Sequence, residues 1–304
     1  MKHLDPSRMY NLLRSRQLES TQSEDPYVGA WIVTSMRILR GWGSPPESAT
    51  PYYAERWPPL EPPGMDDLAR QYRVQAYQRV RNVIECKLAI ASGHLVYAEF
   101  DCGKEWFWEM EGVKEVPQSA PKRVSIMMMG YNDHTSLFTI RNRWAADLGD
   151  RSLGYFSYDF FEKYFLESWA TNGLDREPRS SDQSGLLEMR WSTEEILGGS
   201  LRAVELYDST QDECIGWAFT VCRDGFLDIE ELFVRPAFRG NKHGNRLVDM
   251  LRDLSAQERL PLRLWVAHAD LGQGNLPTVE RIANRLSLHL QPSDVQWAGL
   301  KGVD

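Results

Sequence analysis

The 304-residue sequence has no apolar run of the length needed to cross a membrane, which excludes a membrane-spanning helix. The first twenty residues carry charges throughout and lack the apolar core of a signal peptide, so we expect a cytoplasmic protein. Excess positive charge is also lacking. The formal net charge is -8, so no general attraction to nucleic acid or to anionic membranes is expected.

Cysteine and histidine are scarce. The four cysteines, Cys86, Cys102, Cys214 and Cys222, form no C-x-x-C pair, which in a cytosolic chain favours reduced thiols over disulfides or zinc ligands. The six histidines show neither H-x-H nor H-x-x-x-H spacing, so no metal site is expected. Neither an internal repeat nor a long low-complexity tract is present.

The length predicts two domains. Residues 171–185, TNGLDREPRSSDQSG, are rich in glycine, proline, serine and charge, as is typical of a linker. We therefore expect one domain over residues 1–172, a linker over 173–184 and a second domain over 185–304. The pattern predicts an α+β fold class for the chain.

In the first domain, Ala30–Arg40 and Met65–Glu85 have helical spacing of apolar residues. Alternating apolar residues predict four strands after them, HLVYAEFDC, RVSIMMMGY, SLFTIRNRW and GYFSYDFF.

The second domain reads as a mostly antiparallel sheet followed by a β–loop–α–β crossover. The predicted elements are strands over Leu186–Trp191, Leu201–Tyr207, Cys214–Arg223, Phe226–Val234 and Leu262–His268, helices over Gly244–Glu258 and Thr278–Leu286, and a short strand over Val295–Leu300.

The loop after Val234 carries most of the functional information. Arg235-Pro236 stops the strand, and Arg239-Gly240-Asn241-Lys242-His243-Gly244 leads into a helix. Such a loop can turn several backbone N–H groups and the positive end of the helix toward one anion, such as a pyrophosphate. A surface turn that only connects strand and helix is the alternative.

The loop and its context resemble the acetyl-CoA-binding motif of the GNAT superfamily, whose loop reads Gln/Arg-x-x-Gly-x-Gly/Ala. Arg239 and Gly244 match the first and last positions, whereas Lys242 replaces the middle glycine. The resemblance covers about residues 185–304 and implies acetyl-CoA or another acyl-CoA as donor. It implies a pantetheine site along Leu232, Phe233 and Val234, between two splayed parallel strands. It also implies donor contacts at the loop, Asn245 and Asn275, although Asn275 alternatively reads as a helix cap.

Amide formation requires a neutral amine and a proton source for the leaving thiolate. In polyamine-type GNATs a glutamate at the position of Glu230 contacts the acceptor amine, so the resemblance implies Glu230 as base or amine anchor. Glu231 is the second candidate, because a bulge could exchange the faces of the two side chains. Solvated carboxylates on an exposed strand are the alternative. The tyrosine that often serves as general acid is missing, since Ile282 falls near its place, and His268 or water could replace it.

GNAT domains usually open with a strand and two helices that shape the acceptor pocket. Between Gly185 and Leu201 there is room only for a strand and a turn, so we expect the N-terminal domain to complete the pocket for a small-molecule or peptide amine. Otherwise the pocket is open enough for a large acceptor.

The N-terminal domain resembles a papain-like cysteine peptidase. The matching stretches are Gly43–Glu47 with Pro51-Tyr52, Gly130-Tyr131, Asn142–Ala145 and Gly154-Tyr155. A thiol peptidase needs a cysteine, a histidine and an orienting asparagine. Only Asn142 matches, because Val124 occupies the histidine position and the cysteine-bearing helix would precede residue 10. We therefore expect a peptidase-inactive scaffold whose exposed apolar surface favours docking on the GNAT domain or a homodimer.

Three functions remain open at this point. The first is an acyl-CoA-dependent N-acyltransferase. The second is amide formation from an aminoacyl donor other than CoA. The third is a non-catalytic binding or scaffold protein, which the missing tyrosine, Lys242 and the lost peptidase dyad favour.

Overall fold

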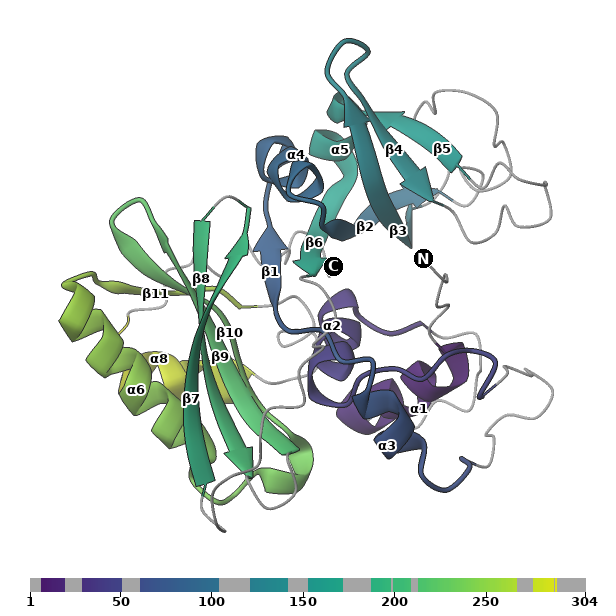
Figure 1. The fold of residues 1–304 in the computed structure, drawn as a ribbon. Helices are drawn as coiled ribbons and strands as arrows, with labels where there is room; N and C mark the ends of the chain where they lie inside the picture. The colour runs from purple at the N-terminus through teal and green to yellow at the C-terminus, as the bar shows by residue number, and fades with distance from the viewer. Residues whose placement is uncertain are drawn as a thin grey trace. The chain divides into compact units, whose positions relative to one another are not determined.

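The computed structural model describes residues 7–19, 29–50, 61–103, 121–141, 153–171, 187–197, 199–208, 213–266, 276–286 and 288. Helices and antiparallel strands are mixed along the chain, and the predicted α+β class is confirmed (Figure 1). Within these ranges no helix combines the length and apolar character of a membrane span.

The chain forms two compact units. The first unit comprises residues 1–76, 173–194 and 200–304, and the second comprises residues 77–172 and 195–199. The predicted domains divided the chain near residue 172 only. In the structure, the first 76 residues group with the C-terminal sheet.

The first unit is built on a five-stranded sheet of order β11-β10-β9-β8-β7. Its strands are β7 (Leu187–Ile196), β8 (Gly199–Asp208), β9 (Glu213–Arg223), β10 (Phe226–Val234) and β11 (Leu262–Leu264). Strands β8, β9 and β10 pair antiparallel, whereas β10 and β11 pair parallel, as the sequence predicted.

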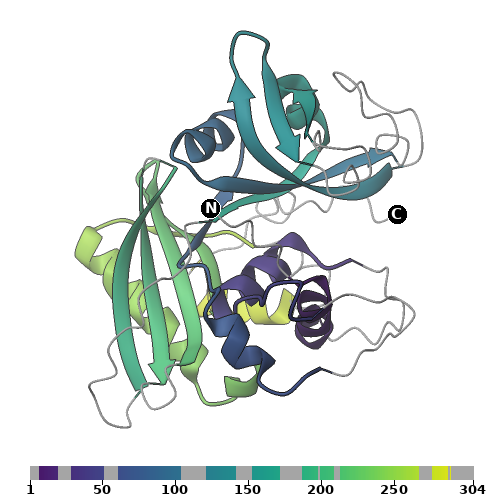
Figure 2. The same cartoon turned by 45° about the vertical axis from the view of Figure 1, so that its right-hand side comes forward.

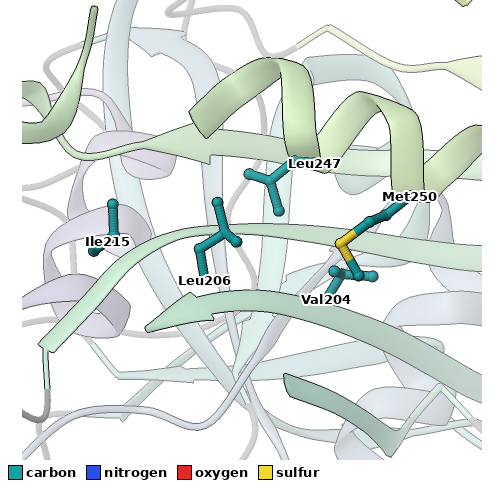
Figure 3. Close-up of a cluster of buried hydrophobic side chains, with 5 residues drawn as sticks. All are labelled: Val204, Leu206, Ile215, Leu247 and Met250. Carbon is teal, nitrogen blue, oxygen red and sulfur yellow. The ribbon is translucent and has the colours of Figure 1, made fainter. Parts of the chain in front are cut away.

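Helices α6 (His243–Glu258) and α8 (Leu276–Arg285) cover one face of this sheet (Figures 1 and 2). Apolar side chains of β8, β9 and α6 form a buried cluster of Val204, Leu206, Ile215, Leu247 and Met250 (Figure 3). A second cluster joins Ile229 of β10 to Val248 and Leu251 of α6 and to Leu286. These clusters follow from the helical spacing of apolar residues along α6.

The opposite face of the sheet receives helix α2 (Ile32–Gly41), with α1 (Arg8–Glu19) and α3 (Met65–Arg70) packed beside it around Tyr10, Ile38 and Ala69. Arg40 of α2 is fully buried and pairs with Glu205 of β8. A Cβ on Gly41 would lie 3.2 Å from the Trp217 ring, so α2 approaches the sheet closely.

The second unit contains a six-stranded sheet of order β1-β6-β2-β3-β4-β5. Its elements are β1 (Tyr77–Val80), α4 (Val83–Ala91), β2 (Leu95–Gly103), β3 (Pro121–Asn132), β4 (Leu137–Arg141), β5 (Leu153–Ser157), α5 (Tyr158–Tyr164) and β6 (Phe165–Thr171). Phe100 packs edge-on against Phe156 and Phe161 in its core.

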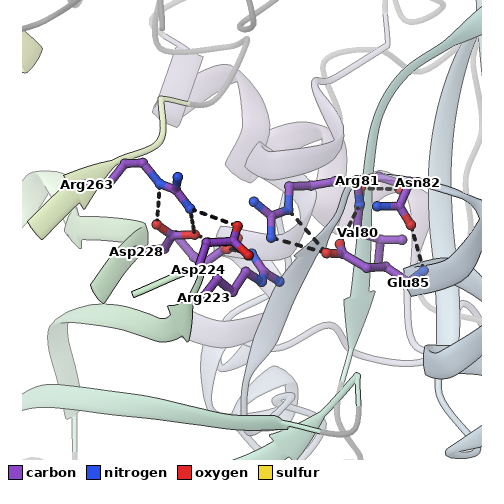
Figure 4. Close-up of polar contacts among 10 residues, drawn as sticks. Val80, Arg81, Asn82, Glu85, Arg223, Asp224, Asp228 and Arg263 are labelled. Atoms are coloured by element: carbon purple, nitrogen blue, oxygen red, sulfur yellow. Dashed lines mark hydrogen bonds and ion pairs between the residues drawn. The ribbon is translucent and has the colours of Figure 1, made fainter. Parts of the chain in front are cut away.

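Two elements predicted in the N-terminal half of the chain are wrong. The helix predicted over Met65–Glu85 is divided into α3, β1 and the start of α4, because Asn82 caps a new helix. Its side chain accepts a hydrogen bond from the Glu85 N–H at 2.9 Å, and Glu85 accepts one from the Arg81 N–H (Figure 4). The strand predicted over residues 154–161 ends at Ser157, whose hydroxyl caps α5 in the same way.

Strand β6 and helix α1 were not predicted at all. The helix predicted over Ala30–Arg40 is confirmed within two residues as α2, and β10 has the predicted bounds. The strand predicted over Val295–Leu300 lies outside the described residues.

Candidate functional site

In the first unit, strand β10 continues past the end of its partner β11, and a cavity lies beside this stretch. Within the described residues the two strands pair from Leu227–Ile229 to Leu262–Leu264, and a further bond runs from the Trp265 N–H to the Ile229 carbonyl at 3.1 Å. β10 then continues to Val234. A cavity of about 570 Å³ lies along this stretch, with β10 on one side and Leu264 to Val266 on the other. Its volume is that of a small-molecule site.

The end of the β10–β11 pairing coincides with an irregularity in β10. Ile229 lies opposite Thr220 and Glu231 lies opposite Phe219, so Glu230 is an extra residue between them. Before this bulge Ile229 packs toward α6, and after it Leu232 and Val234 do. Alternation along the strand therefore places Glu230 and Glu231 both on the face away from α6.

Glu230 belongs to a group of charged residues at the start of the cavity. Its carboxylate pairs with Arg223 of β9. The same arginine lies 3.9 Å from Asp228, whose two oxygens accept hydrogen bonds from Arg263 of β11 at 2.6 and 3.0 Å (Figure 4). These ion pairs join β9, β10 and β11 where the pairing between β10 and β11 ends.

Glu231 is held by a residue from the N-terminal part of the chain. Arg37 of α2 donates to its two carboxylate oxygens at 3.1 and 2.9 Å. The Leu232 N–H donates to the same carboxylate at 3.1 Å. The Arg37 guanidinium also lies 5.0 Å from the centre of the Phe233 ring. The fork of Arg37 thus fixes the position of Glu231 on the cavity wall.

Sequence reasoning did not find the residues that α1 and α2 add to this cavity. They are Leu18 and Glu19 of α1 and Thr34 and Arg37 of α2. One signal was available. Arg37 and Arg40 lie three residues apart on a helix that is otherwise mostly apolar, and buried arginines require carboxylate partners. The sequence does not say which carboxylates these are.

The loop predicted to bind an anion closes the other end of the cavity. Residues Arg239, Gly240, Lys242, His243, Gly244 and Asn245 all line it, while Asn241 is exposed and does not. Lys242 is the N-cap of α6 and has φ +62°, the left-handed conformation that favours glycine. This conformation explains why a glycine suits the position, and the lysine adopts it at an energetic cost.

Two side chains of this loop make specific contacts. Arg239 turns back toward the strand, and its Nε donates to the Val234 carbonyl at 3.0 Å. His243 is buried at the start of α6, and its Nδ1 has no hydrogen-bond partner among the described residues. Burial and the nearby Arg246 lower the pKa of His243, so the ring is neutral at neutral pH.

This end of the cavity has features suited to bind phosphate groups. It combines the N-terminus of a 16-residue helix, a buried imidazole with an unused nitrogen and the cationic side chains of Lys242 and Arg281. Ile282 lines the cavity from α8, where many GNAT proteins carry a tyrosine. Asn275, His268 and Asn142 lie outside the described residues, so their predicted roles stay predictions.

The comparisons with known proteins give one family-model match and several similar solved structures. Residues 158–279 match the family model of the acetyltransferase (GNAT) family, so the predicted GNAT resemblance is confirmed for this part of the chain. The match extends from α5 to α8 and covers less than half of the chain. A comparison with curated proteins gave no match.

Among solved structures, the chain is similar to xylellain, a cysteine protease from Xylella fastidiosa, with 21% identity and a TM-score of 0.49 over 57% of this chain and 72% of that one. It is similar to the clostridial cysteine protease Cwp84, with 18% identity and a TM-score of 0.45 over 62% and 52% of the two chains. A putative acyl-CoA N-acyltransferase from Klebsiella pneumoniae matches at 23% identity and a TM-score of 0.23 over 26% and 55%.

Proposed function

We propose that the first unit is an acyl-CoA-dependent N-acyltransferase whose acceptor wall is formed by α1 and α2. One observation carries the proposal. One cavity along β10 is lined by the Arg239–Gly244 loop, by Glu230 and Glu231, and by residues of the two N-terminal helices. The GNAT family match over residues 158–279 supports acyl transfer in general.

The loop and the first turn of α6 would hold the pyrophosphate, and the open edge of Leu232–Val234 would pair with the pantetheine arm. A bound acyl-CoA supplies a thioester, whose C–S bond is replaced by a C–N bond to the amine while the sulfur takes up a proton. Glu230 would anchor the acceptor amine on the β10 side of the cavity. Arg37 would keep Glu231 in place on the wall of the same cavity.

Titration calorimetry with acetyl-CoA tests the donor site. Gly244→Glu places a negative charge in the first turn of α6, where it suits the helix but repels a pyrophosphate. A Cβ at this position meets only Val234, at 3.9 Å, so the change should not disturb the fold. We expect the Kd to rise at least ~10-fold in Gly244→Glu and less in the neutral control Gly244→Gln. Absence of acetyl-CoA binding in the unaltered protein would contradict the proposal and favour another donor or a binding role.

Glu230→Gln tests the chemistry. We expect turnover on amines to fall about 100-fold with an unchanged Kd for acetyl-CoA. Glu231→Gln is the companion variant. If it causes the larger loss, the role belongs to Glu231.

We also propose that the second unit has no cysteine peptidase activity. Val124, at the position where the peptidase family carries its histidine, lies buried in β3. Cys86 is fully buried in α4, and burial raises the pKa of its thiol, so the reactive thiolate is disfavoured. An epoxide inhibitor of cysteine peptidases should leave the protein unlabelled. Covalent labelling together with hydrolysis of a peptide substrate would disprove this.

A further inference from the structure

Glu19 also contributes a carboxylate to the wall of the cavity. Neither the Arg239–Gly244 loop nor the glutamates of β10 indicate it. It is the last residue of α1 and only 9% exposed, and it lines the cavity beside Leu18 and Thr34. Its Oε1 accepts a hydrogen bond from the Trp31 N–H at 3.0 Å, and the Thr34 side chain lies close to it. The carboxylate is therefore fixed in the wall that α1 and α2 contribute.

The cavity lining carries charges of both signs. The loop after β10 and helix α8 contribute Arg239, Lys242, Arg281 and Arg285. The wall formed by β10, α1 and α2 contributes Glu19, Glu230 and Glu231, together with Arg37. Three carboxylates on this wall favour a cationic acceptor.

The three carboxylates differ in their partners. Arg223 pairs with Glu230, and Arg37 binds both oxygens of Glu231, so guanidinium groups occupy these two. Glu19 accepts its hydrogen bond from the Trp31 backbone N–H, which is a neutral donor, and the Thr34 hydroxyl lies nearby. Arg16 and Arg37 act on it only through charge, and burial raises its pKa above the ordinary value. A desolvated carboxylate with a neutral donor accepts a proton more readily than an exposed one.

We propose that Glu19 binds the alkylammonium group of the acceptor and accepts its proton. In this step one N–H bond of the ammonium breaks, the proton passes to a Glu19 oxygen, and the nitrogen keeps the electron pair that it needs for attack. The acceptor class is then a primary alkylamine, which is cationic at neutral pH. The inference rests on the proposed acyl transfer, which it specifies. The competing explanation is that Glu19 only ties the Trp31 N–H to the end of α1.

Direct binding of butylamine, followed by NMR titration without any donor, tests the first half of the proposal. Glu19→Gln keeps a carbonyl oxygen for the Trp31 N–H but removes the charge. We expect butylamine binding to weaken about 10-fold or more in this variant. The control is Glu280→Gln on α8, which removes an exposed carboxylate whose side chain does not line the cavity. Equal binding by Glu19→Gln and the unaltered protein would overturn the proposal.

Steady-state acylation of butylamine and of aniline, which is uncharged at neutral pH, tests the second half. Glu19→Gln should lower kcat/KM for butylamine about 100-fold, while the value for aniline and the Kd for acetyl-CoA stay nearly unchanged. In the unaltered protein, kcat/KM for butylamine should fall as the pH falls through the raised pKa of Glu19, and this limb should shift in the variant. An equal loss for both amines would assign Glu19 a structural role.

The two proposals fail in different ways. If acetyl-CoA does not bind, the proposed transfer from this donor is disproved, and the butylamine titration still decides whether Glu19 binds an ammonium group. If acylation proceeds but Glu19→Gln binds and acylates butylamine like Glu280→Gln, only the proposed role of Glu19 is disproved.

Discussion

The two units place buried carboxylates in opposite surroundings. In the first unit Glu205, Glu231 and Asp228 each contact an arginine. In the second unit Glu99 of β2 lies directly opposite Glu167 of β6, and both are buried. Glu167 accepts a hydrogen bond from the Trp169 indole N–H at 2.6 Å, which is a neutral donor.

The difference shows two ways in which a sheet can hold a buried acid. An arginine partner keeps the carboxylate charged and joins two elements, as Arg40 and Arg37 join α2 to the sheet. A second carboxylate instead favours retention of a proton. Burial, followed by the charge of Glu167, raises the pKa of Glu99 to about 7. The first arrangement fixes structure at all ordinary pH values, whereas the second makes stability depend on pH.

Removal of Arg40 should produce the largest effect. Arg40→Met leaves Glu205 charged and buried without its partner, and we expect the first unit to lose about 4 kcal/mol of unfolding free energy. Denaturant unfolding measures the loss. The double variant Arg40→Met/Glu205→Met should recover most of it, because both charges are then absent. An equally unstable double variant would mean that packing, and not charge, determines the effect.

Glu99→Gln should stabilise the second unit, and only at higher pH. Because the pKa of Glu99 is raised in the folded state, its favourable contribution is complete below its unfolded pKa and is lost as the pH rises through about 7. The variant should match the unaltered protein at pH ~4 and exceed it by up to about 3 kcal/mol at pH ~8. Calorimetry of the second unit at both pH values checks this. A gain of the same size at both would show that repulsion and burial of charge are not the cause.

Arg37→Met should cost less than Arg40→Met, although both arginines pair with a buried glutamate. Arg37 and Glu231 line a cavity, where water can solvate the remaining carboxylate, so we expect a loss of about 2 kcal/mol. Turnover should fall as well, because Glu231 loses the fork that positions it. Denaturant unfolding and amine acylation measure the two effects. A loss equal to that of Arg40→Met would contradict access of water to the pair.

Local signals in the sequence predicted much of the first unit. The bounds of β10 were predicted because its apolar run ends at Arg235-Pro236, and the parallel β10–β11 pair followed from the crossover pattern. The loop after β10 was recognised from its glycines and its position before a helix. The same local reasoning gave a wrong helix over residues 65–85, since helical spacing of apolar residues did not reveal the cap at Asn82.

What the sequence could not provide is long-range pairing. Arg37 and Glu231 are 194 positions apart, and the sequence around either residue does not predict that the other is its partner. The short stretch between Gly185 and Leu201 predicted that the GNAT-like region lacks the two helices of the acceptor wall and that the N-terminal part supplies them. The sequence could not identify α1, Glu19 or the face of the sheet that α2 covers, because these follow from packing alone.

Glu19 sharpens the comparison between the units, because it behaves like Glu99 although it belongs to the first unit. Burial raises its pKa, so its contribution to stability is present at low pH and is lost as the pH rises. At pH values above neutral, Glu19→Gln should therefore cause a small rise in the Tm of the first unit. Near pH ~4 it should leave the Tm unchanged. The gain should be smaller than that of Glu99→Gln, because Arg16 and Arg37 offset part of the cost of the Glu19 charge. If Glu19→Gln gains stability but loses butylamine binding, the charge of Glu19 serves acceptor binding and not the stability of the fold. A variant with a lower Tm at every pH would instead show that the bond to the Trp31 N–H is the main role of Glu19.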